Sequence, residues 1–391
     1  MYNNKSIELV KKILKTNKTN YWTGNQCNLF EKEFSNYIGN KYSVSVSNGS
    51  VALEIALNAL NLKKNDQVIV TPRSFIISAS CVLNLGLKPV FSDIDRNGNL
   101  SFDGIKNAYN KNVKAIILVH LKGLSCDLSK IIDFVKKNKL YLIEDCSQAH
   151  GAIYKGNKVG SFGTISTWSF CQDKIISTGG EGGMISTNSK RLWKKCWSMK
   201  DHGKNYNSCF IKKHKIGFKW LHDDLGSNYR LTEIQAALGR EQLNNLEKSI
   251  NKRIKIANLY IQGLKKYYTK YDLLEKPNFK CLECPLKNSS KSCNKCRHVF
   301  YRLNLFINIK KINQTHLIKK LNDNKISCGV GSCPEIYREK IFIKKSLKRK
   351  RLKNAKKLGK TSLVFPITPH RKISLVKNDI SIIKKVFDGY V

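Results

Sequence analysis

The sequence predicts an α/β fold with a mostly parallel sheet covered by helices on both faces. From residue 42 onward, apolar runs of strand length alternate with helical patterns, as expected of parallel strands joined by helices. The chain has 391 residues, enough for a large core and two domains, and its 41% hydrophobic content is ordinary for a globular protein.

The elements are predicted in a regular order along the chain. An amphipathic helix at 6–15 comes first, and a strand that starts near residue 42 ends at a turn of small polar residues. Further strands are expected at 67–70, 89–92, 113–120, 140–145, 164–170 and 183–187, with helices at 50–60 and 128–138 between them. A long helical region at 231–265 then leaves the sheet domain, and a strand-like segment follows at 300–309. We therefore expect a large domain over residues 1–250 and a small C-terminal α/β domain over 251–391, with the N-terminal helix packed near the small domain.

The formal net charge of +43 comes from 71 Lys and Arg residues against 28 Asp and Glu residues. The lysines recur along the whole chain, and aromatic residues are not interleaved with the denser stretch at 344–360. This pattern favours solvated faces and no specific nucleic-acid partner, although polyanion binding stays open as a non-enzymatic alternative. No apolar run reaches the roughly 18 to 20 residues of a membrane span. The thirteen cysteines suit reduced thiols, so we expect a cytoplasmic protein without a membrane partner.

The most informative motif surrounds Lys174, which lies between a strand-like run and a glycine-rich turn at 179–183. Ser169 stands five residues before it. Pyridoxal phosphate chemistry needs these groups, because a lysine amine forms a Schiff base, a hydroxyl holds the phosphate and glycines let the backbone pass close by. By itself the motif also fits a solvated loop.

Two further motifs lie at predicted strand ends. Gly49 and Ser50 open a helix, where free N–H groups form a phosphate site or the serine merely caps the helix. Asp145 ends an apolar strand, where a carboxylate pairs with a pyridine nitrogen, ligates a metal or caps a helix. Gln148 follows it at a spacing that suits contact with a ring hydroxyl, whereas His150 is expected to be structural.

Two side chains complete the pattern. Phe75 follows the strand at 67–70 and is either a ring-stacking aromatic or a core residue. Asn228 precedes the long helical region and either binds phosphate or caps the helix. Each motif has an ordinary structural explanation. Along the chain they follow in the order of phosphate turn, aromatic residue, strand-end acid, serine with lysine, glycine turn and asparagine, and this order is that of a single kind of cofactor site.

With this motif set the chain resembles the DegT/DnrJ/StrS aminotransferases, which are fold-type I pyridoxal phosphate enzymes acting on sugars. The resemblance runs from about residue 30 to residue 337. It implies that Lys174 is the catalytic lysine and that Asp145 binds the pyridine nitrogen. It also implies that Gln148 and Phe75 contact the ring and that Gly49, Ser50 and Ser169 hold the phosphate. Asn228 is then expected to reach the phosphate in a neighbouring protomer of a homodimer.

The resemblance implies transfer of an amino group from an amino acid, L-glutamate, to a keto sugar linked to a nucleotide. Lys174 is expected to have a lowered pKa in the active form, and His298 and Tyr301 match a segment near the active site. Three alternatives remain at this point: a cyclitol-ketone aminotransferase, a sugar dehydratase with the same cofactor, and a catalytically silent polyanion-binding relative. A branch of the family that dehydrates sugars has histidine in place of the lysine, so Lys174 favours transamination.

A cysteine-rich insert at 281–296 is not needed for any of these motifs. It contains Cys281, Cys284, Cys293 and Cys296 in a CxxC-x8-CxxC pattern. Four thiolates at this spacing suit one structural zinc ion, whereas reduced thiols and an iron–sulfur cluster are the alternatives.

Overall fold

The computed structural model describes residues 2–277, 295–345, 347 and 350–391. Its centre is a seven-stranded sheet of order β1-β9-β8-β5-β4-β2-β3, in which β9 runs against both of its neighbours and the other pairs are parallel. The strands of this sheet are β1 (Tyr42–Val46), β2 (Gln67–Val70), β3 (Lys88–Phe91), β4 (Val113–Val119), β5 (Tyr141–Asp145), β8 (Ile165–Ser169) and β9 (Gly183–Thr187). The predicted mostly parallel α/β sheet is confirmed, with strand bounds close to those expected.

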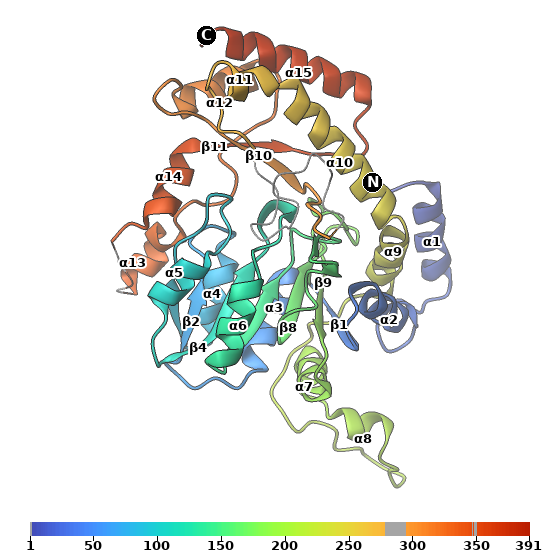
Figure 1. The fold of residues 1–391 in the computed structure, drawn as a ribbon. Helices are drawn as coiled ribbons and strands as arrows, with labels where there is room; N and C mark the ends of the chain where they lie inside the picture. Colours follow the sequence, from blue (N-terminus) through green and yellow to red (C-terminus); the bar gives the residue numbers. More distant parts are fainter. Residues whose placement is uncertain (1, 278–294, 346, 348–349) are drawn as a thin grey trace.

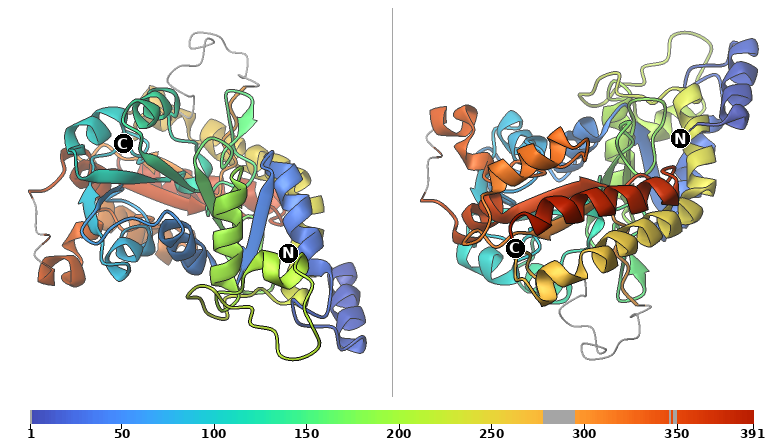
Figure 2. Two further views of the ribbon diagram at one scale, coloured as in Figure 1. Left: turned by 90° about the horizontal axis from the view of Figure 1, so that it is seen from below. Right: turned by 90° about the horizontal axis from the view of Figure 1, so that it is seen from above.

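Helices cover both faces of the sheet (Figures 1 and 2). On β4, Ala115 and Ile117 pack into the core shared with α3, α4 and α7, whereas Ile116 and Leu118 pack with α5 and α6 on the opposite face. This alternation follows from the two-residue period of a strand and makes each strand apolar on both sides. The helices of this domain are α2 (Gln26–Ile38), α3 (Gly49–Asn58), α4 (Ile77–Asn84), α5 (Phe102–Ala108), α6 (Ser129–Lys137) and α7 (Lys190–Lys200).

The predicted long helical region at 231–265 consists of two helices, α9 (Glu233–Asn244) and α10 (Leu246–Gly263). Asn245 separates them, with its side-chain amide donating to the Glu241 carbonyl oxygen. α9 packs against α2 and against the N-terminal helix α1 (Asn4–Lys15). α10 then runs to a second hydrophobic core at the top of Figure 1.

The second core holds a two-stranded antiparallel sheet, β10 (Arg302–Phe306) with β11 (Ser362–Pro366). Figure 2, right, shows α10 and α15 lying over these strands. The other elements of this part are α11 (Lys265–Thr269), α12 (Gln314–Asp323), η2 (Ile336–Arg338), α13 (Lys340–Lys344), α14 (Lys353–Thr361) and α15 (Ile373–Asp388). Ile336, Tyr337 and Phe342 pack into the core of the large sheet instead, so this segment joins the two parts of the chain. The division at residue 250 remains a proposal.

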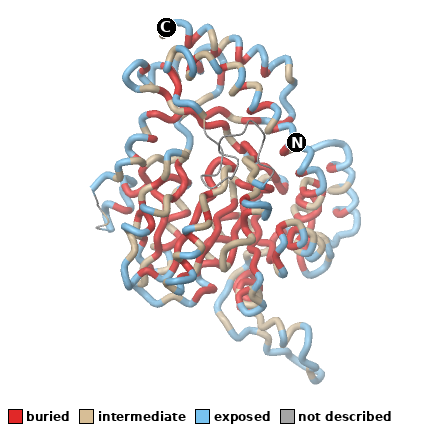
Figure 3. Tube along the Cα trace, in the orientation of Figure 1, coloured by how far each residue is buried: buried red, intermediate tan, exposed pale blue. Residues whose placement is uncertain are grey.

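An arm extends from the lower end of the molecule in Figure 1. It comprises α8 (Tyr206–Phe210) and the segment that follows it, and it exposes large apolar side chains. Among these, Ile216, Phe218 and Trp220 are 108%, 80% and 85% exposed. Figure 3 shows the contrast with the buried central strands. No helix in the described ranges is both long and apolar enough to cross a membrane.

Candidate active site

Three predicted site segments meet at the edge of the sheet where the parallel strands end. β5 ends at Asp145, β8 ends at Ser169, and α3 begins at Gly49 shortly after β1. Ligands bind at this edge in open α/β sheets, because loops and helix N-termini gather there. The predicted residues therefore come together through the topology of the sheet.

The turn before α3 fits closely against the end of β8. Asn48 caps the helix, its side chain accepting from the Val51 N–H at 2.9 Å. A Cβ atom placed on Gly49 would lie 2.6 Å from Cβ of Ser169, so this position has room for glycine alone. Ser50 follows in the first helical turn, where N–H groups and the helix dipole favour an anion. The geometry fits a phosphate seat formed by Gly49, Ser50 and Ser169.

The Asp145 carboxylate is buried, with an exposed fraction of 4%. It accepts a hydrogen bond from the Ser147 N–H at 3.1 Å and from the Ser78 hydroxyl at 3.3 Å. These two bonds orient the carboxylate and leave it further acceptor capacity toward the sheet edge. A carboxylate held in this way can stabilise a positively charged ring nitrogen.

Lys174 lies among polar side chains from both parts of the chain. Its Nζ atom is 3.0 Å from the Asp173 carboxylate and 5.4 Å from the ring centre of Tyr301. The Tyr301 hydroxyl donates to Asp173, and Arg302 lies 3.5 Å from the same carboxylate. Tyr301 comes from the segment that leads into β10, so residues next to the small sheet contact the Lys174–Asp173 pair.

These contacts change the pKa of Lys174 in the chain without cofactor. Burial lowers the pKa of Lys174, but its interactions with Tyr301 and Asp173 outweigh burial and raise that pKa above its ordinary value. Burial raises the pKa of Asp173, and the Tyr301 hydrogen bond and the Lys174 charge reverse this and lower it. The lowered lysine pKa was predicted for the form with the cofactor bound, and for that form it stays a prediction. The motif gave no sign that Asp173 would hold the amine.

The remaining predicted residues, Gln148, Phe75 and Asn228, differ in their contacts and in their exposure to solvent. Gln148 accepts from the Lys122 N–H at 2.8 Å and shares a cavity with Tyr301. Phe75 is 68% exposed near the end of β2, which excludes its being a core residue. Asn228 is exposed and pairs with Asp201 in an isolated bridge.

His150 is buried and His298 is half-buried, and loss of solvent around each ring lowers its pKa to about 3. The ring of His150 packs against Trp168 and Phe170, as expected for a structural histidine. The ring of His298 stacks on Phe300 with ring centres 3.9 Å apart. Both imidazoles are therefore uncharged at neutral pH.

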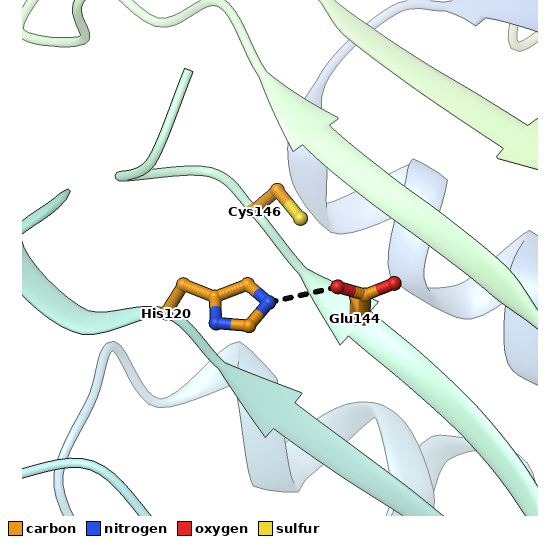
Figure 4. Close-up of side chains that lie close together, drawn as sticks. All are labelled: His120, Glu144 and Cys146. Atoms are coloured by element: carbon orange, nitrogen blue, oxygen red, sulfur yellow. Dashed lines mark hydrogen bonds and ion pairs between the residues drawn. The ribbon is translucent and has the colours of Figure 1, made fainter. Parts of the chain in front are cut away.

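A second buried cluster lies beside the site and contains His120, Glu144 and Cys146 (Figure 4). The Cys126 N–H donates to Nδ1 of His120 at 3.1 Å, so Nε2 carries the proton and donates to Glu144 at 3.0 Å. The Glu144 carboxylate also accepts three backbone N–H groups, from Gly160, Phe162 and Gly163. Its acceptor capacity is used by these four bonds, so the cluster holds the loop before β8 and does not form a metal site.

The predicted zinc ligands Cys281, Cys284 and Cys293 lie outside the described residues. Cys296 is described, and its Sγ atom accepts from the Lys155 N–H at 3.4 Å. The structure therefore gives no information on the four-cysteine arrangement.

Sequence reasoning missed Asp173, Arg73 and Lys122 as parts of this region. Asp173 directly precedes Lys174 in the sequence, and this position was the one sign that its carboxylate could contact the lysine amine. Arg73 and Lys122 follow β2 and β4 in loops that look ordinary in the sequence. Their burial could not be foreseen, since it depends on the small sheet that covers them.

The described residues fit pyridoxal phosphate. A glycine cradle at a helix N-terminus, a buried carboxylate at a strand end and a lysine amine share one sheet edge, and these are the three groups that this cofactor requires. Together with the mostly parallel sheet, they define the class of fold-type I pyridoxal phosphate enzymes. The chain belongs to the DegT/DnrJ/EryC1/StrS aminotransferase family, which matches residues 2–384. The predicted family and fold class are confirmed.

The chain is similar to relatives that are named for amino sugars and to a solved aminotransferase structure, and it spans less than two thirds of the length of the two curated relatives named below. The chain is 39% identical to a GDP-perosamine synthase of Escherichia coli O157:H7 over 242 residues, 62% of this chain and 64% of the relative. It is 37% identical to a UDP-N-acetyl-3-dehydro-alpha-D-glucosamine 3-aminotransferase of Acidithiobacillus ferrooxidans over 242 residues, 62% of each chain. The crystal structure of an aminotransferase from Psychrobacter cryohalolentis matches with a TM-score of 0.94 and 40% identity, covering 100% of this chain and 98% of the other.

Proposed function

We propose that this chain is a pyridoxal phosphate-dependent aminotransferase that transfers an amino group from L-glutamate to a keto sugar linked to a nucleotide. The meeting of three chain segments at one sheet edge carries the proposal: Gly49 packs against Ser169 at the end of β8, Asp145 is buried at the end of β5, and Lys174 follows β8. The family supports the reaction class, and the similarity to relatives that are named for GDP and UDP sugars supports the acceptor class.

Each residue has a chemical task in this proposal. Pyridoxal phosphate supplies an electron sink for the bonds at the substrate carbon. The Lys174 amine removes a proton from the donor carbon and later returns one to the sugar carbon. Asp145 holds a positive charge beside the ring, and the N–H groups at the start of α3 hold the phosphate. Asp173 and Tyr301 keep the Lys174 amine at the mouth of the site.

The proposal includes a homodimer in which Asn228 reaches the partner's phosphate site. Asn228 is exposed, which fits a role toward a second copy. The arm that follows α8 exposes Ile216, Phe218 and Trp220, and a surface of this kind favours burial against another protomer. Light scattering of the purified protein tests this, because a mass of one chain would contradict it.

Two further parts of the proposal rest on the sequence. We propose cytoplasmic localisation from the cysteine usage, and a structural zinc ion at the cysteine-rich insert 281–296 from the ligand spacing. Metal analysis of protein purified without chelator tests the zinc proposal. One zinc ion per chain is expected, and a result with neither zinc nor iron contradicts it.

The visible absorption spectrum of the purified protein tests the central proposal. A cofactor band that bleaches on addition of excess L-glutamate is expected, whereas Lys174→Ala should turn over no substrate. Lys114→Met provides a matched control, because Lys114 is an exposed lysine on β4. A protein that stays colourless with added pyridoxal phosphate would contradict the enzyme and bring forward the polyanion-binding alternative.

A further inference from the structure

The loop that carries Lys174 is held together by its own backbone. The Phe170 N–H donates to the Gly182 carbonyl oxygen at 2.7 Å, which closes the loop after β8. Inside it the Lys174 N–H donates to the Cys171 carbonyl oxygen at 2.9 Å, so residues 171–174 form a turn. The backbone of Lys174 is therefore fixed locally, and side-chain contacts decide where its amine lies.

The Asp173 carboxylate contacts three groups from two parts of the chain. One of its oxygens, Oδ1, lies 3.0 Å from Nζ of Lys174. The other, Oδ2, accepts a hydrogen bond from the Tyr301 hydroxyl and lies 3.5 Å from Nη2 of Arg302, the first residue of β10. If the lysine amine leaves, Tyr301 and Arg302 still hold the carboxylate, so its negative charge keeps its partners.

Other titratable groups around Lys174 come from three elements. His150, which follows β5, has a pKa of about 3 because it is buried, so it is uncharged at neutral pH. Burial raises the pKa of the Cys171 thiol, which is therefore uncharged as well. Arg253 on α10 interacts electrostatically with Tyr301, and although burial lowers its pKa to about 10 it stays positive. The acid in direct contact with the amine is Asp173.

The contact with Asp173 favours the charged form of the Lys174 amine. Burial lowers the pKa of Lys174, but Tyr301 and Asp173 together raise it above its ordinary value. A Schiff base forms only from the neutral amine: the ammonium proton goes to solvent, Nζ bonds to the aldehyde carbon and the carbonyl oxygen leaves as water. Asp173 therefore holds the amine in place but reduces the share of it that can react.

We propose that Asp173 is a positioning residue that holds the free Lys174 amine and sets the pH above which the chain takes up pyridoxal phosphate, and that Arg302 competes with Lys174 for its carboxylate. This inference rests on the proposed function, which supplies the cofactor. It predicts shifts of opposite sign. Without the Asp173 charge the neutral amine should form at lower pH, whereas without the Arg302 charge Asp173 should hold the ammonium more strongly and uptake should need higher pH.

The test is the pH dependence of cofactor uptake by the full-length chain. Bound cofactor is removed by dialysis against hydroxylamine, pyridoxal phosphate is added back, and growth of the visible absorption band is followed between about pH 6 and 10. The proteins are wild type, Asp173→Asn, Arg302→Gln and the control Asp133→Asn, at an exposed acid on α6. The titration of the cofactor itself is common to all four, so differences between the curves report on the chain.

We expect Asp173→Asn to take up cofactor about threefold or more faster than wild type at about pH 8, with its curve moved to lower pH. Asparagine can still accept from Tyr301, so the fold around it should persist. The curve of Arg302→Gln should move to higher pH, and the control should follow wild type. Asp173→Glu, which keeps the charge, should restore most of the wild-type pH dependence.

The proposal is overturned if Asp173→Asn and wild type rise at the same pH, or if both variants move in the same direction, as a general loosening of the site would cause. Thermal unfolding shows whether each variant is folded, and either variant decides alone if the other is not. Uptake with unshifted curves retains the proposed function and removes this role of Asp173. A chain that takes up no cofactor at any pH overturns the proposed function and this inference with it.

Discussion

Glu144 and Lys122 are both buried charged side chains near the same sheet edge, but their surroundings differ. Glu144 is 0% exposed and accepts four hydrogen bonds, whereas Nζ of Lys122 has no hydrogen-bond partner in the described part of the chain. A satisfied buried charge stabilises the fold around it, and an unsatisfied one costs stability unless a ligand completes it. Two buried ionisable side chains in one region of the molecule therefore make opposite contributions to its stability.

Glu144→Ala should have the largest effect on stability. It leaves the His120 imidazole and three backbone N–H groups without an acceptor, so we expect the free energy of unfolding to fall by about 4 kcal/mol. Urea unfolding measures this, with Glu8→Ala as a control because Glu8 is an exposed acid on α1. A loss below about 1 kcal/mol, which is the contribution of a surface ion pair, would mean that the hydrogen bonds of Glu144 do not stabilise the fold more than an exposed charge does.

Asp145→Asn should affect turnover more than stability. Asparagine can still accept from the Ser147 N–H but carries no negative charge to stabilise the ring, so we expect turnover to fall about a hundredfold or more. Steady-state kinetics measures the turnover, and thermal unfolding should show a nearly unchanged midpoint. Asp103→Asn, at an exposed acid on α5, serves as the control. Turnover near that of wild type would exclude Asp145 from the cofactor site.

His298 should make the free energy of unfolding depend on pH. Its folded-state pKa of about 3 lies below the ordinary value of about 6.5, so the unfolded chain takes up a proton first as pH falls. The stability contributed by neutral His298 is present above pH 6.5 and is lost as pH falls toward 3, with a slope of up to about 1.4 kcal/mol per pH unit. His298→Gln should lose less stability than wild type between about pH 6.5 and 4.5. Unfolding at several pH values checks this, and His316→Gln, at an exposed histidine, should follow wild type.

Lys122→Met should have the smallest effect on stability, and it should stabilise the protein where Glu144→Ala destabilises it. Replacing an unpartnered buried ammonium with an apolar side chain of similar length should raise the free energy of unfolding by about 1 kcal/mol. Chemical unfolding of this variant beside Lys114→Met measures the gain. A clear loss of stability would mean that Lys122 supports the fold, as Glu144 does.

Much of the large domain could be predicted because its signals are local. The strand at Gln67–Val70 was expected at the same residues, since a short apolar run between polar turns has few other interpretations. Gly49, Asp145 and Ser169 could be placed at strand ends for the same reason. The break at Asn245 was missed because the residues on both sides of it favour a helix, and the turn there depends on contacts made by α10.

The sequence by itself determined the alternating elements, the order of the cofactor motifs and the identity of Lys174, because each depends on residues that are neighbours in the chain. Tertiary structure alone decided how these groups interact. Tyr301 meets Asp173, and Arg73 meets Val330 and Ser362, across long separations in the sequence. Such contacts set the lysine pKa and the buried cations, since both depend on burial and on charges that only the folded chain brings together.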